Sequence, residues 1–149
     1  MSASEELEAL KAERERLVEE REAREAARAE ARELEALKIG IADEQAILKA
    51  EAELGQVGVD IATVRSAKGH GVVIVKRPTH AQYRLLVDSL RADKMTLSAI
   101  NERFVLSVLV HPTKADFESI LKKESGLLDR VADQAAFLGG LVVGEVQGK

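Results

Sequence analysis

The side chains best suited to acid–base or metal chemistry near neutral pH are the histidines, and the chain has three of them, at positions 70, 80 and 111. None of the three has another His, Asp or Glu at the i, i+4 spacing that places two metal ligands on one helical face. No serine lies in a nucleophile-elbow pattern, and the absence of cysteine excludes thiolate nucleophiles, thiolate metal sites and disulfides. The sequence therefore predicts no catalytic, cofactor-binding or metal-binding residue, and a function that is not enzymatic.

Basic residues gather near the middle of the chain, where Lys76 and Arg77 precede a helix that contains Arg84. The two arginines could meet an acidic protein partner or the chain's own acidic segment. Alternatively, they form the solvated rim of a helix start. The net charge of −4 gives no overall attraction to nucleic acid or to an anionic membrane, so the expected partner is a protein.

These candidate residues lie in the second of two chemically different segments. Residues 1–54 lack aromatic residues and proline, and they carry nine basic and sixteen acidic side chains; the rest of the chain carries thirteen basic and ten acidic ones. The first segment consists mainly of Ala, Glu, Arg and Leu, which favour helix. We therefore expect an acidic helical arm over residues 1–54, followed by a small domain over residues 55–149.

Two interpretations of the arm are open. Its a and d heptad positions are charged in the middle, at Glu13, Glu20 and Arg24, and apolar toward both ends. The apolar positions of this track are Leu10, Leu17, Ala27, Ala31, Leu34, Ile41 and Leu48. The arm is either a coiled coil that binds itself or a partner, or a solitary helix with i, i+4 ion pairs. Gly40 favours a break or kink, after which Asp43 would cap a second helix.

The pattern after Gly55 changes to the two-residue period of β-structure. Alternating apolar residues and the β-branched run 72–75 flank a glycine-rich turn, which predicts a β-hairpin within residues 57–77. The second strand is apolar on both faces. Because two strands alone are marginally stable in water, we expect other elements or another chain to cover this hairpin.

Four short helices are expected within residues 79–139. Thr79 begins a capping box, and Thr96 and Thr113 stand at the starts of two further helices. The helix that begins at Thr96 is expected to continue to Val110. Gly126 is expected to end the third helix in the left-handed conformation. The expected fold is therefore mainly α: a long N-terminal helix or coiled-coil arm, then a β-hairpin, then a small bundle of four short helices.

The aromatic residues of these helices are the candidate partner-binding residues. The second of the four helices is the most apolar, so we expect it at the centre of the bundle with Phe104 directed inward. Tyr83 and Phe117 lie on the apolar stripes of neighbouring helices. We expect these three aromatic residues to line the core or a groove that receives a protein partner, with Arg77 and Arg84 at its rim.

A series of motifs runs through the small domain in a fixed order. The Val-rich hairpin is followed by Lys76-Arg77-Pro78-Thr79, the helix with Tyr83, the segment Val108-Leu109-Val110-His111-Pro112, the helix with Phe117, Gly126-Leu127-Leu128 and finally Leu138-Gly139. Over about residues 56–140 this series resembles the tail assembly chaperones of tailed bacteriophages. Those proteins bind the tape-measure protein before the tail tube polymerises around it. The long charged arm departs from their compact form.

The resemblance implies a non-catalytic chaperone in virion morphogenesis whose partner is a helical, tape-measure-like protein, with no cofactor. The alternative is a structural coiled-coil adaptor subunit of a virion or another multiprotein assembly, with a homo-oligomer formed through the arm. The chain has no apolar run near the roughly 20 residues that span a membrane, and its acidic start lacks the apolar core of a signal peptide. We therefore expect a cytoplasmic location, in the host if the protein is phage-encoded.

Overall fold

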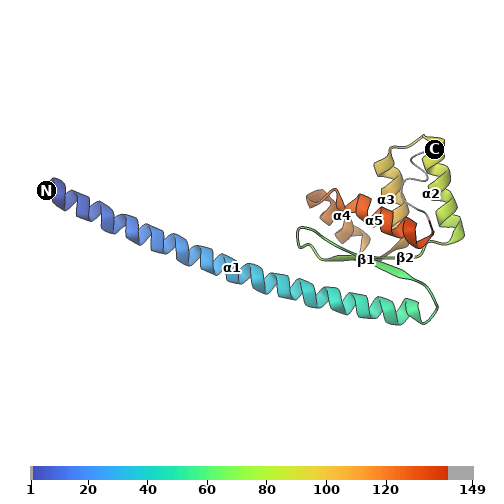
Figure 1. The fold of residues 1–149 in the computed structure, drawn as a ribbon, viewed down its shortest axis with the longest axis horizontal. Helices are drawn as coiled ribbons and strands as arrows, with labels where there is room; N and C mark the ends of the chain where they lie inside the picture. Colours follow the sequence, from blue (N-terminus) through green and yellow to red (C-terminus); the bar gives the residue numbers. More distant parts are fainter. Residues whose placement is uncertain (1, 141–149) are drawn as a thin grey trace. The chain divides into compact units, whose positions relative to one another are not determined.

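The structure is a computed structural model that describes residues 2–140, shown in Figure 1. Its elements, in chain order, are α1 (Ala3–Gly55), β1 (Ile61–Arg65), β2 (Val72–Lys76), α2 (His80–Ala92), α3 (Leu97–Val108), β3 (Leu109–His111), α4 (Lys114–Lys123) and α5 (Leu127–Leu138). The prediction of a mainly α fold with a long N-terminal helix, a hairpin and four short helices is confirmed. The chain forms two compact units, which divide between Lys38 and Ile39.

The first unit is a helix with almost no buried side chain. From Ala3 to Lys38 every residue except Val18 is exposed. Ser2 caps the helix, since its hydroxyl oxygen accepts a hydrogen bond from the backbone N–H of Glu5 at 3.2 Å. Helix propensity, capping and local ion pairs are therefore the interactions that favour this stretch of helix within a single chain.

Helix α1 continues through Gly40, so the expected break at that residue is absent. A glycine inside a helix costs about 1 kcal/mol relative to alanine, which helical neighbours and packing can offset. Asp43 accordingly does not cap a second helix. It lies inside α1 on the side that is buried against the strands.

The sheet has three antiparallel strands in the order β1-β2-β3, with β2 in the centre. Val72 and Ile74 pack on one face against residues of α1, namely Ala46, Ile47 and Ala50. Val73 and Val75 pack on the other face in the main core. Figure 1 shows the last turns of α1 along the side of the sheet opposite α3 and α5. The expectation that β2 needs a cover on both faces is confirmed.

This packing changes the domain boundary that the sequence indicated. The second unit begins at Ile39, not at residue 55, because the final turns of α1 bury one face of β2. The change in composition near residue 55 marks the end of the helix, whereas the change in packing occurs earlier within it.

Strand β3 was not expected. The apolar pattern predicts a helix that continues to Val110, but α3 ends at Val108 and the next three residues pair with β2, with a bulge between Ile74 and Val75. The other edge of β2 already pairs with β1. The remaining backbone groups of this buried strand need partners, and β3 supplies them.

The predicted helix starts are confirmed. Thr79 forms a complete capping box at α2, and Thr96 and Thr113 cap α3 and α4 through their side chains. Gly126 differs from the expectation: its backbone is right-handed, and it stands before α5 as the N-cap. The turn between α4 and α5 is therefore not closed by a left-handed glycine.

The main core lies between the sheet and the helices α3 and α5. Its fully buried large side chains include Phe117, Leu127, Val105, Val108 and Val131. Among residues 2–140, no helix is both long enough and apolar enough to cross a membrane.

Candidate functional site

The five residues expected at a partner-binding site fall into two environments. Phe117 is fully buried and Phe104 is 5% exposed, and both belong to the main core. Tyr83 is partly buried, while Arg77 and Arg84 are exposed. The two phenylalanines therefore stabilise the unit, and Phe117 is not available to a partner in this conformation.

Phe104 also reaches a groove between α2 and α3. The buried side chains that line it are Leu86, Ile100 and Phe104, each about 5% exposed. Leu85 and Met95 also line the groove, and they are 50% and 40% exposed. The groove thus combines an apolar floor with two large apolar side chains that water can reach.

Polar groups complete the lining of this groove. They are Gln82, Ser89, Arg103 and Ser107. The side-chain amide of Gln82 donates a hydrogen bond to the carbonyl oxygen of Ser107 at 3.0 Å, which joins α2 to the last turn of α3. A fixed polar border around an apolar floor is typical of a protein-binding groove.

The hollow of this groove is small compared with the sites that hold small molecules. Its volume is about 80 Å³. Sites for drug-sized ligands and cofactors usually occupy about 300–1,000 Å³. A space of this size is large enough for about one aliphatic side chain.

Tyr83 lies away from this lining and holds the end of α5. An added Cβ at Gly139 would lie 2.8 Å from Cδ2 of Tyr83 and 2.9 Å from Cγ of Pro78. The glycine therefore permits close packing of the C-terminal end of α5 on the start of α2. Tyr83 has a structural contact that the sequence did not predict.

The two arginines also differ in their contacts. The backbone N–H of Arg77 donates to the carbonyl oxygen of Asp60 at 2.8 Å, and its guanidinium lies 3.5 Å from the carboxylate of the same residue. Arg77 thus has an acidic partner within the second unit, just before β1. Arg84 is exposed on α2.

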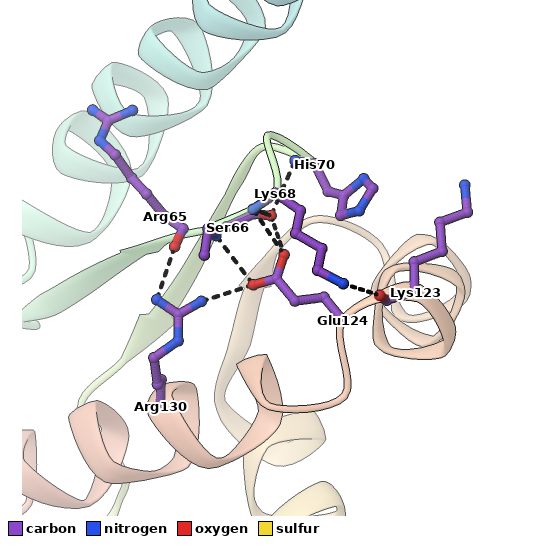
Figure 2. A network of polar contacts seen from close by, with 8 residues as sticks. Arg65, Ser66, Lys68, His70, Lys123, Glu124 and Arg130 are labelled. Atoms are coloured by element: carbon purple, nitrogen blue, oxygen red, sulfur yellow. Dashed lines mark hydrogen bonds and ion pairs between the residues drawn. The ribbon is translucent and has the colours of Figure 1, made fainter.

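Sequence reasoning missed the most connected polar group, the buried carboxylate of Glu124, which Figure 2 shows. It accepts hydrogen bonds from the hydroxyl of Ser66, from the backbone N–H of Ala67 at 3.1 Å and from that of Lys68 at 3.2 Å. The guanidinium of Arg130 donates to it at 2.8 Å. An acidic residue at the C-terminal end of a helix opposes the helix dipole, and that was the available signal of a specific role.

These contacts attach the hairpin turn to the junction of α4 and α5. The hydrogen bond from Ser66 is the largest influence that lowers the pKa of Glu124. Burial opposes it, and the N–H groups of Ala67 and Lys68 and the charge of Arg130 lower the pKa further. Arg130 also donates to the carbonyl oxygen of Arg65 at 3.2 Å. A single side chain of α5 therefore contacts both the carboxylate of Glu124 and the last residue of β1. We interpret this network as structural, because every contact is made within the fold.

A second hollow brings together two histidines that are far apart in the sequence. His70 and His111 line a cavity of about 400 Å³ together with Asp43 and Asp116. Within residues 2–140, no three His, Asp or Glu side chains converge in a manner that could hold a metal ion. The two histidines of this cavity therefore do not belong to such a group of three.

The α2–α3 groove is the candidate site that the geometry supports best. The sequence signals for it were weak, because Leu85 falls outside the main apolar stripe of α2 and Met95 lies in a connection. Comparison of the chain with models of protein families, with curated proteins and with solved structures finds no match.

Proposed function

We propose that this chain is a non-catalytic assembly chaperone that holds a helical, tape-measure-like protein during construction of a phage tail. The observation that carries the binding role is the α2–α3 groove, where exposed Leu85 and Met95 lie beside a buried apolar floor. The resemblance of residues 56–140 to tail assembly chaperones supports the identity of the client. The proposed location is the cytoplasm of the host.

The groove suits an amphipathic helix of the client. A client helix would insert one aliphatic side chain into the hollow and place residues one turn away on Leu85 and Met95. Arg103, which lines the groove, would meet polar or acidic groups of the client, and such a charge acts mainly on orientation and association rate. Binding through an apolar anchor should therefore persist at moderate salt, where exposed charge pairs are screened within about 10 Å.

The test is recovery of a soluble tape-measure protein, from the same genome, co-expressed with this chain. We expect Leu85→Glu and Met95→Glu to reduce recovery and pull-down, because each places a charge on the apolar contact. Leu97→Glu is the matched control: Leu97 is 49% exposed on α3, close to the 50% of Leu85, and does not line the groove.

Equal client recovery with and without this chain would contradict the chaperone proposal. So would equal loss with the Leu85 and Leu97 variants, because that result would point to general instability. Circular dichroism of each purified variant separates loss of binding from loss of fold. The position of the gene gives an independent test, since a chaperone gene is expected between those of the major tail protein and the tape measure.

The exposed leucines of α1 favour a second candidate function, that of a structural coiled-coil adaptor in a larger assembly. Leu10, Leu17 and Leu34 are each at least half exposed on a helix that has few other contacts. An adaptor remains in the finished assembly in stoichiometric amounts, whereas a chaperone leaves. Quantitative mass spectrometry of purified particles distinguishes these two functions.

A further inference from the structure

The exposed apolar residues of α1 form a seam with heptad spacing. Leu10 and Leu17 lie seven residues apart and share one of the two apolar heptad positions, a and d. Leu34, Ile41 and Leu48 follow at the same spacing and share the other. Each of these five residues is between 50% and 64% exposed. A row of large apolar side chains along one helical face is typical of a helix that packs against another helix.

Charged residues occupy other positions of the seam, and the acidic ones lie nearer the N-terminus than the basic ones. Glu13 and Glu20 come first, Arg24 is central and Lys38 comes last. In a parallel homodimer each seam residue faces its own equivalent, so all four would meet a like charge. Like charges at facing positions oppose association, which disfavours the parallel arrangement.

We propose that two copies of this chain pair antiparallel along this seam, in the register that places Leu17 of one copy against Leu34 of the other. The same register places Leu10 against Ile41. Each contact occurs twice, because a homodimer of this kind has two-fold symmetry. The proposal concerns α1 alone and does not rest on client binding at the α2–α3 groove.

The register also pairs opposite charges. Glu13 of one copy faces Lys38 of the other, and beside the seam Arg14 faces Glu35. Both pairs are repeated at the other end of the dimer by symmetry. The register that pairs the large apolar residues of the seam therefore also pairs acidic with basic residues.

The centre of the seam is compatible with this register. Arg24 faces Ala27 of the other copy, and Glu20 faces Ala31. Within one helix the guanidinium of Arg24 already lies 2.8 Å from the carboxylate of Glu20. The small alanines leave room for the aliphatic stems of these two residues, while the charged ends pair with each other at the edge.

One flanking pair opposes the register. Arg21 of one copy faces Arg28 of the other. Arg21 also has Glu25 at 3.9 Å within its own helix, which offsets part of its charge. Exposed charge pairs beside a seam contribute little, so the seam residues decide the alignment.

The part of the seam in the second unit is open to a second copy. Asp43 and Ala50 are buried on the side of α1 that packs on the strands. Ile41 and Leu48 are 60% and 64% exposed, and helical periodicity places them on the opposite side of α1. A partner helix can therefore contact them without displacing the sheet.

Cysteine crosslinking of the full chain tests direction and register, and it benefits from the absence of native cysteine. We expect Leu17→Cys and Leu34→Cys to form a covalent dimer on oxidation only when the two variants are mixed. A mixture of Leu10→Cys with Leu34→Cys, which is one heptad out of register, is the matched control and should give none. Efficient crosslinking of either single variant alone would overturn the proposal in favour of parallel pairing.

Charge exchange provides a second readout, by sedimentation equilibrium at low salt. Glu13→Lys and Lys38→Glu should each weaken the dimer about tenfold or more, since each places two like-charge pairs in the seam. The double variant should restore wild-type dimerisation. A wild-type chain that stays monomeric at the highest soluble concentration would overturn the proposal, as would a double variant that is no better than the single ones.

Discussion

The carboxylate oxygen Oδ1 of Asp43 accepts a hydrogen bond from the backbone N–H of Val72 at 2.9 Å, which connects α1 to the first residue of β2. Both residues are buried. The neighbouring residue must be small, because a Cβ at Gly71 would lie 3.2 Å from the same oxygen, and Gly71 has a φ of +107°. This contact fixes the last turns of α1 on the outer face of the sheet.

Replacement of Asp43 by alanine is expected to lower the free energy of unfolding by about 1–3 kcal/mol, because the N–H of Val72 loses its buried partner. Urea unfolding followed by circular dichroism measures the change. Glu44→Ala is the control: Glu44 is exposed, and its 3.2 Å ion pair with Arg65 should contribute less than about 1 kcal/mol. Equal effects of the two variants would contradict the role given to Asp43.

The last turns of α1 should be required for folding of the second unit. We expect a fragment of residues 39–149 to fold, whereas a fragment of residues 56–149 should be strongly destabilised. Removal of the helix exposes Val72 and Ile74, and burial of such side chains contributes about 1.5–3 kcal/mol each. That is a large share of the roughly 5–15 kcal/mol typical of a domain. Thermal unfolding of the two fragments measures the difference, and equal midpoints would contradict it.

The Glu124 network predicts acid sensitivity. In the folded state the pKa of the Glu124 carboxyl group lies below its ordinary value, chiefly because of the hydrogen bond from Ser66, so the unfolded chain binds a proton more readily. The stabilisation is fully present above the ordinary pKa of the unfolded chain and is lost as the pH falls through the lowered pKa. Glu124→Gln should remove this part of the pH dependence, which urea titrations from pH 6 downward would measure. If the variant lost stability at low pH as strongly as the wild type, other carboxylates would be the cause of that loss.

Two substitutions of glycine by alanine should have opposite effects. Gly139→Ala brings a methyl group within 3 Å of Tyr83 and Pro78, and overpacking of this kind costs about 1–3 kcal/mol. Gly40→Ala meets no atom within 4 Å inside a helix and should stabilise it by up to about 1 kcal/mol. Differential scanning calorimetry of both variants gives the comparison. No destabilisation by Gly139→Ala would contradict the packing assigned to Tyr83, and destabilisation by Gly40→Ala would contradict the open surroundings of Gly40.

Local chemistry made part of this fold predictable. Threonine caps at 79, 96 and 113 begin helices because a side-chain oxygen satisfies a free N–H within one turn, whatever the rest of the chain does. The β-branched run 72–75 likewise indicated a strand that needs two covers. The heptad track of α1 can also be read directly from residue spacing.

The tertiary structure decided the features that depend on distant partners. The break expected at Gly40 is absent, and the turns of α1 beyond it dock on β2 through Asp43. Residues 109–111 leave a helical pattern because a buried strand edge needs hydrogen bonds. The floor of the α2–α3 groove and the contacts of Glu124 join residues from separate elements. The sequence determined where helices begin and which side chains are apolar, because those properties are local. Only the folded chain decided which apolar faces are covered, because burial depends on the whole of it.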